Sequence, residues 1–220
     1  MHGTNNSSTK NICVIGGGNW GKNHIKTLHS LNCLAGVVDS DESVINVINK
    51  VYPTCKVFSN VDDALGMNFD GYIIATGPSS HYSLAKKIIF NKKHLLIEKP
   101  MTLNTSDAKE LCDLADDNKV KLMVGHLLLF HPAFNKMKEM CSRGDIGDLQ
   151  YMYSNRLNYG TIRSNENVFW SFAPHDVSLF QYYAESNPQD ISSTGIDIIQ
   201  PGIHDSTITT IKYENGIDED

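Results

Sequence analysis

The sequence contains no long apolar segment and no grouped cysteines. No run of about 18 apolar residues occurs, so no transmembrane helix is predicted. Residues 1–10 are polar and lack the apolar core of a signal peptide, which predicts a flexible leader on a soluble cytoplasmic protein. The five cysteines are odd in number and form no C-x-x-C pair. This spacing favours free thiols over disulfides or a zinc site.

An excess of positive charge and a metal-binding motif are also missing. The formal net charge is −6, which argues against a nucleic-acid surface. The nine histidines form no H-x-x-x-H or H-E-x-x-H group, so we predict no metal. Hydrophobic residues make up 40% of the chain, enough for a globular core. A length of 220 residues is typical of one complete domain and part of a second.

Short apolar segments alternate with amphipathic ones over residues 11–125. This pattern predicts an α/β domain with a doubly wound parallel sheet that is covered by helices on both faces. The predicted strands are 11–15, 35–38, 71–75, 94–97 and 120–124, and the predicted helices are 20–31, 43–51, 81–90 and 104–118.

The pattern changes in residues 126–220, which predict a second, α+β domain with a mainly antiparallel sheet. The predicted strands are 149–155, 192–199 and 206–213, and the predicted helices are 132–141 and 176–184. So few strands leave a sheet edge exposed, so we expect this domain to be truncated or completed by another chain.

The first strand ends in a glycine motif, G-x-G-x-x-G, at Gly16, Gly18 and Gly21, with Asn19 and Trp20 inside the loop. Gly16 permits the tight turn, Gly18 lets the backbone approach a pyrophosphate, and Gly21 lets the helix pack closely on the strand. The following helix presents its N-terminus to the anion. Because the motif follows a strand and opens a helix, it predicts a dinucleotide site of the Rossmann type.

An acidic residue, Asp39, ends the second predicted strand at the spacing expected for binding the adenosine ribose. Its carboxylate would repel a 2′-phosphate and no arginine follows closely, so NAD is predicted over NADP, although Ser40 weakens this preference.

Later strand ends supply more candidates for the same crevice. Thr76 and Pro78 follow the third strand and are predicted to touch the dinucleotide, and Glu98 ends the fourth strand. His81 either touches the cofactor or begins a helix with a structural hydrogen bond, and the sequence leaves both readings open.

Taken in order, these motifs resemble the glucose–fructose oxidoreductase / inositol dehydrogenase (Gfo/Idh/MocA) family over nearly the whole chain. The elements that carry the resemblance are the glycine loop, Ala75-Thr76 with His81, Glu98-Lys99-Pro100, Val124-Gly125-His126 and His175-Asp176. The resemblance implies that Lys99 lies beside the nicotinamide and the substrate, and that a histidine of the second domain acts as acid and base. It also implies a homo-oligomer formed through the second-domain sheet, although members usually run past 300 residues.

Segments 154–158, 166–167 and 170–176 resemble the branch that oxidises the 3-hydroxyl of UDP-N-acetylglucosamine or its uronic acid. We therefore expect an NAD-dependent dehydrogenase that converts a secondary hydroxyl of such a sugar to a 3-keto group. Another sugar or polyol dehydrogenase of inositol type, or a non-catalytic NAD-binding module, remains as an alternative.

The chemistry suggests roles for individual residues. Oxidation of an alcohol needs a base near neutral pKa, which favours His175, and Lys99 would donate to the reacting oxygen. The alternatives are a histidine that begins a helix and a solvated surface lysine. Asp176 either orients the imidazole or binds a sugar hydroxyl, or it only suits the first turn of a helix.

Three further residues are candidates for substrate binding. Arg156 and Asn158 are predicted to hold a carboxylate or diphosphate, with surface placement as the alternative. Trp170 is predicted to stack on a sugar or uracil ring, and core packing is the alternative.

Overall fold

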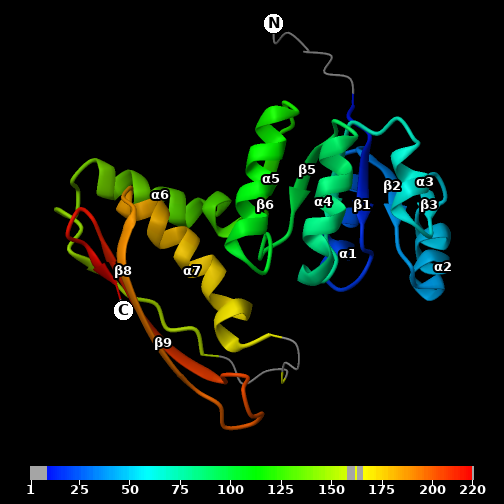
Figure 1. Cartoon of the computed structure of the whole chain (residues 1–220). Helices are drawn as coiled ribbons and strands as arrows, with labels where there is room; N and C mark the ends of the chain where they lie inside the picture. Colours follow the sequence, from blue (N-terminus) through cyan, green and yellow to red (C-terminus); the bar gives the residue numbers. More distant parts are fainter. Residues whose placement is uncertain (1–8, 158–161, 163–165, 220) are drawn as a thin grey trace, which may run out of the picture. The chain divides into compact units, whose positions relative to one another are not determined.

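The computed structural model describes residues 9–157, 162 and 166–219, and the chain divides into two compact units (Figure 1). The N-terminal unit ends at Gly125 and the C-terminal unit begins at His126. In the described residues, no helix is long and apolar enough to cross a membrane.

The N-terminal unit is built on a six-stranded parallel sheet with the strand order β3-β2-β1-β4-β5-β6. Its strands are β1 Ile12–Ile15, β2 Leu34–Val38, β3 Lys56–Phe58, β4 Gly71–Ile74, β5 His94–Ile97 and β6 Leu122–Val124. Its helices are α1 Gly21–Ser30, α2 Glu42–Val51, α3 Val61–Leu65, the short 3-10 turn η1 Pro78–Ser80, α4 His81–Phe90 and α5 Thr105–Asp117. The chain reverses its strand order between β1 and β4, where doubly wound sheets bind ligands.

Side chains that alternate along the strands enter two separate cores. Cys13 and Ile15 of β1 pack with residues of α3, α4 and α5 on one face of the sheet. Val14, which lies between them, packs with Ile25 of α1 and Ile48 of α2 on the other face. This period of two, with both faces covered by helices, confirms the predicted doubly wound sheet.

The sequence prediction misses two elements of this unit, β3 and α3, which follow Pro53. It also begins the last strand at residue 120, whereas β6 begins at Leu122. The Val120 amide donates instead to the Ala115 carbonyl, so that residue closes the end of α5.

The C-terminal unit contains a second sheet with the order β7-β10-β9-β8. Its elements are η2 Leu127–Phe130, α6 Pro132–Ser142, β7 Tyr151–Met152, α7 Val168–Ala184, β8 Pro188–Ile196, β9 Ser206–Tyr213 and β10 Asp218–Glu219. Strands β8, β9 and β10 are antiparallel, and β10 pairs with β7 in parallel. This arrangement confirms a mainly antiparallel α+β unit.

Helix α7 corrects the predicted start of the helix in this unit. It begins at Val168 rather than Asp176, and Asn167 caps it by accepting a hydrogen bond from the Trp170 amide. Pro174 lies inside the helix, so a residue that usually breaks helices is tolerated here. Asp176 therefore does not belong to a first helical turn.

Candidate functional site

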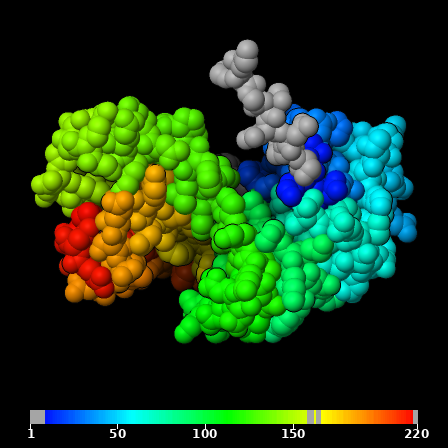
Figure 2. Space-filling view, turned by 90° about the horizontal axis from the view of Figure 1, so that it is seen from above, coloured from blue at the N-terminus to red at the C-terminus, as the bar shows by residue number. Residues whose placement is uncertain are grey.

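The glycine loop joins β1 to α1 at the carboxyl ends of the parallel strands. Figure 2 shows the opposite side of this unit, where the dark-blue chain that leads into β1 reaches the surface. Gly16 has a φ of +94°, and a Cβ there would lie 2.9 Å from the backbone of Ala75. A Cβ on Gly21 would lie 1.8 Å from the Gly16 carbonyl oxygen. A Cβ on Gly18 would meet nothing within 4 Å. Packing within the protein therefore requires the outer two glycines and leaves open space above the middle one.

This open space fits the group that the motif predicts. Helix α1 follows the loop and has no side-chain cap, and Asn19 and Trp20 lie exposed in the turn before it. Uncapped amides at a helix N-terminus suit an anion. The residues present are consequently suited to holding a pyrophosphate.

The Asp39 carboxylate lies directly under the glycine loop. One oxygen accepts the Gly17 amide at 2.7 Å and the other accepts the Asp41 amide at 2.9 Å. A carboxylate has about four acceptor positions, so two backbone bonds leave capacity for a ribose diol.

The loop after β4 brings Thr76, Pro78 and His81 to the same edge of the sheet. The Thr76 hydroxyl and the Ser80 hydroxyl are 2.7 Å apart, and Pro78 begins η1. His81 is completely buried, and its ring nitrogens lie 2.9 Å from the Pro100 carbonyl and 3.0 Å from the Thr76 carbonyl. The side chain of His81 thus lies within hydrogen-bond distance of two backbone carbonyls, which is the structural role predicted as the alternative to cofactor contact.

The turn after β5 carries Glu98, Lys99 and Pro100, with a cis peptide bond between the last two. Glu98 is buried, its Oε1 lies 2.6 Å from His24 Nε2, and its Oε2 accepts the Lys99 amide at 3.3 Å. Burial by itself raises the pKa of the Glu98 carboxyl, but the hydrogen bonds from His24 and Trp20, the charge of His24 and the Lys99 amide together lower it below the ordinary value. Lys99 is half-buried in this turn. Glu98 therefore points into the protein, toward α1.

The C-terminal unit carries the remaining candidates, on α7 and on the segment after β7. His175 is half-buried in the middle of α7. Its neighbour Asp176 accepts a hydrogen bond from the Ser154 hydroxyl at 3.0 Å and forms an ion pair with Arg156. The structure thus pairs Arg156 with Asp176, two residues for which separate roles are predicted from the sequence. Asn158 lies outside the described residues.

A groove of about 800 Å³ opens in this unit beside the ion pair. Apolar side chains from α7 and the sheet line it, among them Phe172, Phe180 and Ile208, together with Arg156 and Asp176. Trp170 does not line this groove, and its side chain is exposed rather than packed in a core.

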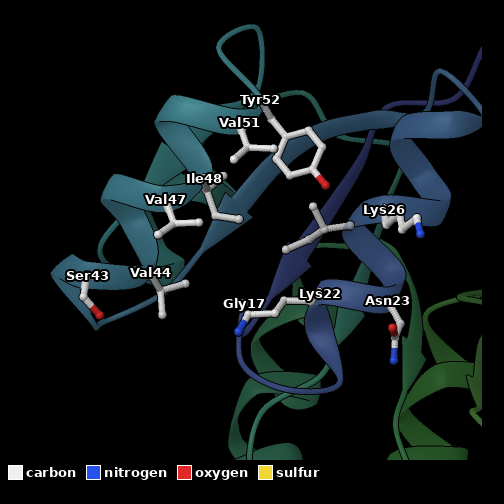
Figure 3. Close-up of a pocket in the computed structure, with 11 residues that line it drawn as sticks. Gly17, Lys22, Asn23, Lys26, Ser43, Val44, Val47, Ile48, Val51 and Tyr52 are labelled. Carbon is white, nitrogen blue, oxygen red and sulfur yellow. The ribbon is translucent and has the colours of Figure 1, made fainter.

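A second groove, of about 440 Å³, runs between α1 and α2 of the N-terminal unit (Figure 3). Val44, Ile48 and Val51 of α2 line it opposite Lys22 and Lys26 of α1. None of the predicted site residues that the structure describes lines it.

Several contacts of these sites could not be predicted from the sequence, in addition to the Arg156–Asp176 ion pair. His24 binds Glu98 across 74 positions of sequence, and Ser154 binds Asp176 across 22. A Cβ on Gly125 would lie 3.0 Å from the Glu98 carboxylate. No local pattern marks such long-range pairs, although His24 follows the glycine motif by three residues.

The fold and the glycine loop together define a dinucleotide-binding protein of the Rossmann class. Residues 10–126 match the sequence profile of the Gfo/Idh/MocA family, an oxidoreductase family with an NAD-binding Rossmann fold. The chain belongs to this family, which confirms the predicted family and its NAD-binding fold.

Similar proteins include named sugar and polyol dehydrogenases. The chain is 30% identical over 185 residues to UDP-N-acetylglucosamine 3-dehydrogenase from Acidithiobacillus ferrooxidans, covering 83% of this chain and 57% of that protein. A solved structure of that protein has a TM-score of 0.85 at 27% identity and covers 96% of this chain and 66% of the other. An NAD-dependent scyllo-inositol 2-dehydrogenase from Bacillus subtilis is 26% identical over 67% of this chain and 46% of its own length. The chain thus spans about half of the curated relatives it matches.

Proposed function

We propose that this protein is an NAD-dependent dehydrogenase that oxidises the C3 hydroxyl of a UDP-linked N-acetylhexosamine, or of its uronic acid, to a 3-keto group. The observation that carries the proposal is the carboxyl edge of the parallel sheet. There, an open glycine loop, the Asp39 carboxylate and the turn with Lys99 follow strands β1, β2 and β5. The likeness to UDP-N-acetylglucosamine 3-dehydrogenase supports the choice of substrate.

In this proposal each group has one task. NAD, held by the glycine loop and Asp39, would supply the acceptor for the hydride that leaves the carbinol carbon. Asp39 binds the adenosine ribose and disfavours a 2′-phosphate, so the cofactor is NAD rather than NADP. His175 takes the hydroxyl proton, because imidazole exchanges protons near neutral pH. Lys99 donates to the substrate oxygen as negative charge develops on it.

The C-terminal unit would hold the rest of the substrate. Asp176 fixes Arg156, whose guanidinium keeps further N–H groups for a carboxylate or a diphosphate. Trp170 is exposed on α7 and offers a face for a sugar or uracil ring. We also propose that the second-domain sheet forms a homo-oligomer.

The direct test is NADH formation at 340 nm with purified protein, NAD and a panel of UDP-sugars and free polyols, with and without 2-oxoglutarate to recycle held cofactor. Turnover of a UDP-N-acetyl sugar that is lost in Lys99→Ala and His175→Ala supports the proposal. Lys109→Ala on the exposed face of α5 is the control and should retain activity.

Two other functions are alternatives to this one. The scyllo-inositol relative favours a polyol substrate, and a polyol dehydrogenase would be stabilised against heat by myo-inositol rather than by a UDP-sugar. The other alternative is a non-catalytic NAD-binding module. NAD binding without turnover, unaffected by Lys99→Ala, would identify that module.

A further inference from the structure

The turn that carries Lys99 is held from two sides by histidines that do not belong to the predicted reaction. We propose that His24 and His81 are positioning residues for Lys99, His24 through the Glu98 carboxylate and His81 through the Pro100 carbonyl. This inference rests on the proposed role of Lys99 as the residue that donates to the substrate oxygen.

The Glu98 side of the turn is fixed by α1. The carboxylate binds His24 at 2.6 Å and the indole of Trp20, and both residues lie within the first turn of α1 or just before it. The same carboxylate accepts the Lys99 amide. Gly125 closes the far side, since a single added carbon there would approach Glu98 to 3.0 Å. The carboxylate therefore links the start of α1 to the backbone of Lys99 and has no free space behind it.

The Pro100 side of the turn is fixed by His81 at the start of α4. Its Nδ1 lies 2.9 Å from the Pro100 carbonyl, and its Nε2 lies 3.0 Å from the Thr76 carbonyl. A carbonyl oxygen only accepts, so whichever ring nitrogen carries the proton donates to the carbonyl that it faces. Asparagine and glutamine carry their N–H donors on a single nitrogen, so in place of His81 they cannot contact both the Pro100 and the Thr76 carbonyl.

These contacts restrain the chain just before and just after Lys99. The amide of Lys99 is bound to Glu98, and the carbonyl of the following residue, Pro100, lies 2.9 Å from His81 Nδ1. The origin of the lysine side chain is thereby held relative to β4 and α1, which carry the loops of the dinucleotide site. An error of about 1 Å in such a group costs roughly 100-fold in rate.

The test compares four variants and reads the environment of Lys99 directly. Lysines are reductively methylated with 13C-formaldehyde, and the Lys99 resonance is assigned by its loss in Lys99→Arg. His24→Ala and His81→Gln should shift this resonance, because each releases one side of the turn. His24→Gln should leave it in place, since the amide nitrogen of glutamine can donate to Glu98 as the imidazole does. His29→Ala is the matched control, because His29 lies on the same helix, is exposed and packs on Tyr52.

Kinetics and calorimetry provide the second readout. In the two releasing variants kcat should fall by roughly 10- to 100-fold while the substrate KM and the NAD affinity change less than about threefold. A Lys99 resonance that stays in place in folded His24→Ala and His81→Gln overturns the proposal, whatever happens to the rate. If His81→Gln does not fold, the two His24 variants decide: a shift with alanine and none with glutamine supports the proposal, and any other pattern overturns it. Absence of NAD binding and turnover in the wild type would refute the proposed function, whereas the resonance comparison would still decide the positioning role.

Discussion

The three glycines of the loop after β1 have different neighbours, so alanine at two of them should have different effects. In Gly21→Ala the new Cβ would lie 1.8 Å from the Gly16 carbonyl oxygen, and a backbone atom cannot rotate away. In Gly18→Ala the new Cβ meets no protein atom within 4 Å, and the residue has no positive φ. We expect the first variant to lose stability and the second to lose cofactor.

The magnitudes follow from the clash and from the helix. Overpacking costs about 1–3 kcal/mol and more when backbone must move, and a contact of 1.8 Å belongs to the upper end. The higher helix propensity of alanine than of glycine stabilises the folded protein by at most about 1 kcal/mol and offsets only part of this cost. Gly21→Ala should therefore destabilise the protein by about 2 kcal/mol or more, which for a chain of this length is a fall in Tm of at least roughly 4–8 °C. Gly18→Ala should stay within about 0.5 kcal/mol of the wild type.

Thermal unfolding followed by circular dichroism measures the first effect, and calorimetric titration with NAD measures the second. A methyl group in the open space above Gly18 should weaken NAD binding by at least about tenfold, or about 1.4 kcal/mol. The reasoning fails if Gly21→Ala has the same Tm as the wild type. It fails equally if Gly18→Ala binds NAD with unchanged affinity, because the open space would then not be the pyrophosphate site.

Three further outcomes can be measured on the same protein. Asp39→Asn should reduce the preference for NAD over NADP, measured as the ratio of the two dissociation constants, because it removes the charge that repels a 2′-phosphate; an unchanged ratio would contradict the role of Asp39. In native protein Cys112 should react first with a thiol reagent, while Cys13 and Cys55 react only on unfolding. Burial raises the pKa of both buried thiols, that of Cys55 to about 11, and equal rates for all three would contradict the packing. The pKa of Glu98 is lowered in the folded protein. The contribution of the charged carboxylate to the free energy of unfolding is therefore complete above the unfolded-state pKa of about 4.3, and it is lost as pH falls through the folded-state pKa. Urea unfolding should therefore show a steeper loss of stability below about pH 5 in the wild type than in Glu98→Gln, and identical slopes would rule this out.

Local patterns in the sequence were enough to predict much of the fold. Helix 81–90 and strands 94–97 and 206–213 are predicted with the bounds that the structure has, because each has clear periodicity and a polar or glycine boundary. Strand β3 has only three residues, too few for a period to be recognised. The start of α7 was missed because Pro174 indicates a helix boundary, whereas the chain places it inside a helix capped at Asn167.

In the candidate site, too, some residues could be predicted from the sequence and others could not. The glycine loop and Asp39 are readable because their spacing is set by one β-α-β unit. The partners of Glu98 and Asp176 are not readable, since hydrogen bonds to His24 and Arg156 depend on tertiary packing. Sequence reasoning therefore finds residues that a motif specifies, and it misses those that hold them in place.

The alternation along β1 also has a consequence for how the protein can change. Cys13 and Val14 are neighbours in sequence, yet they contribute to different cores on opposite faces of one sheet. The sheet acts as a partition, so a change of volume beside α4 and α5 need not be accommodated beneath α1, which begins at the glycine loop. Substitutions on the two faces should be nearly additive in their energetic effects. One layer of helices can thus diverge while the layer that carries the start of the dinucleotide loop keeps its packing.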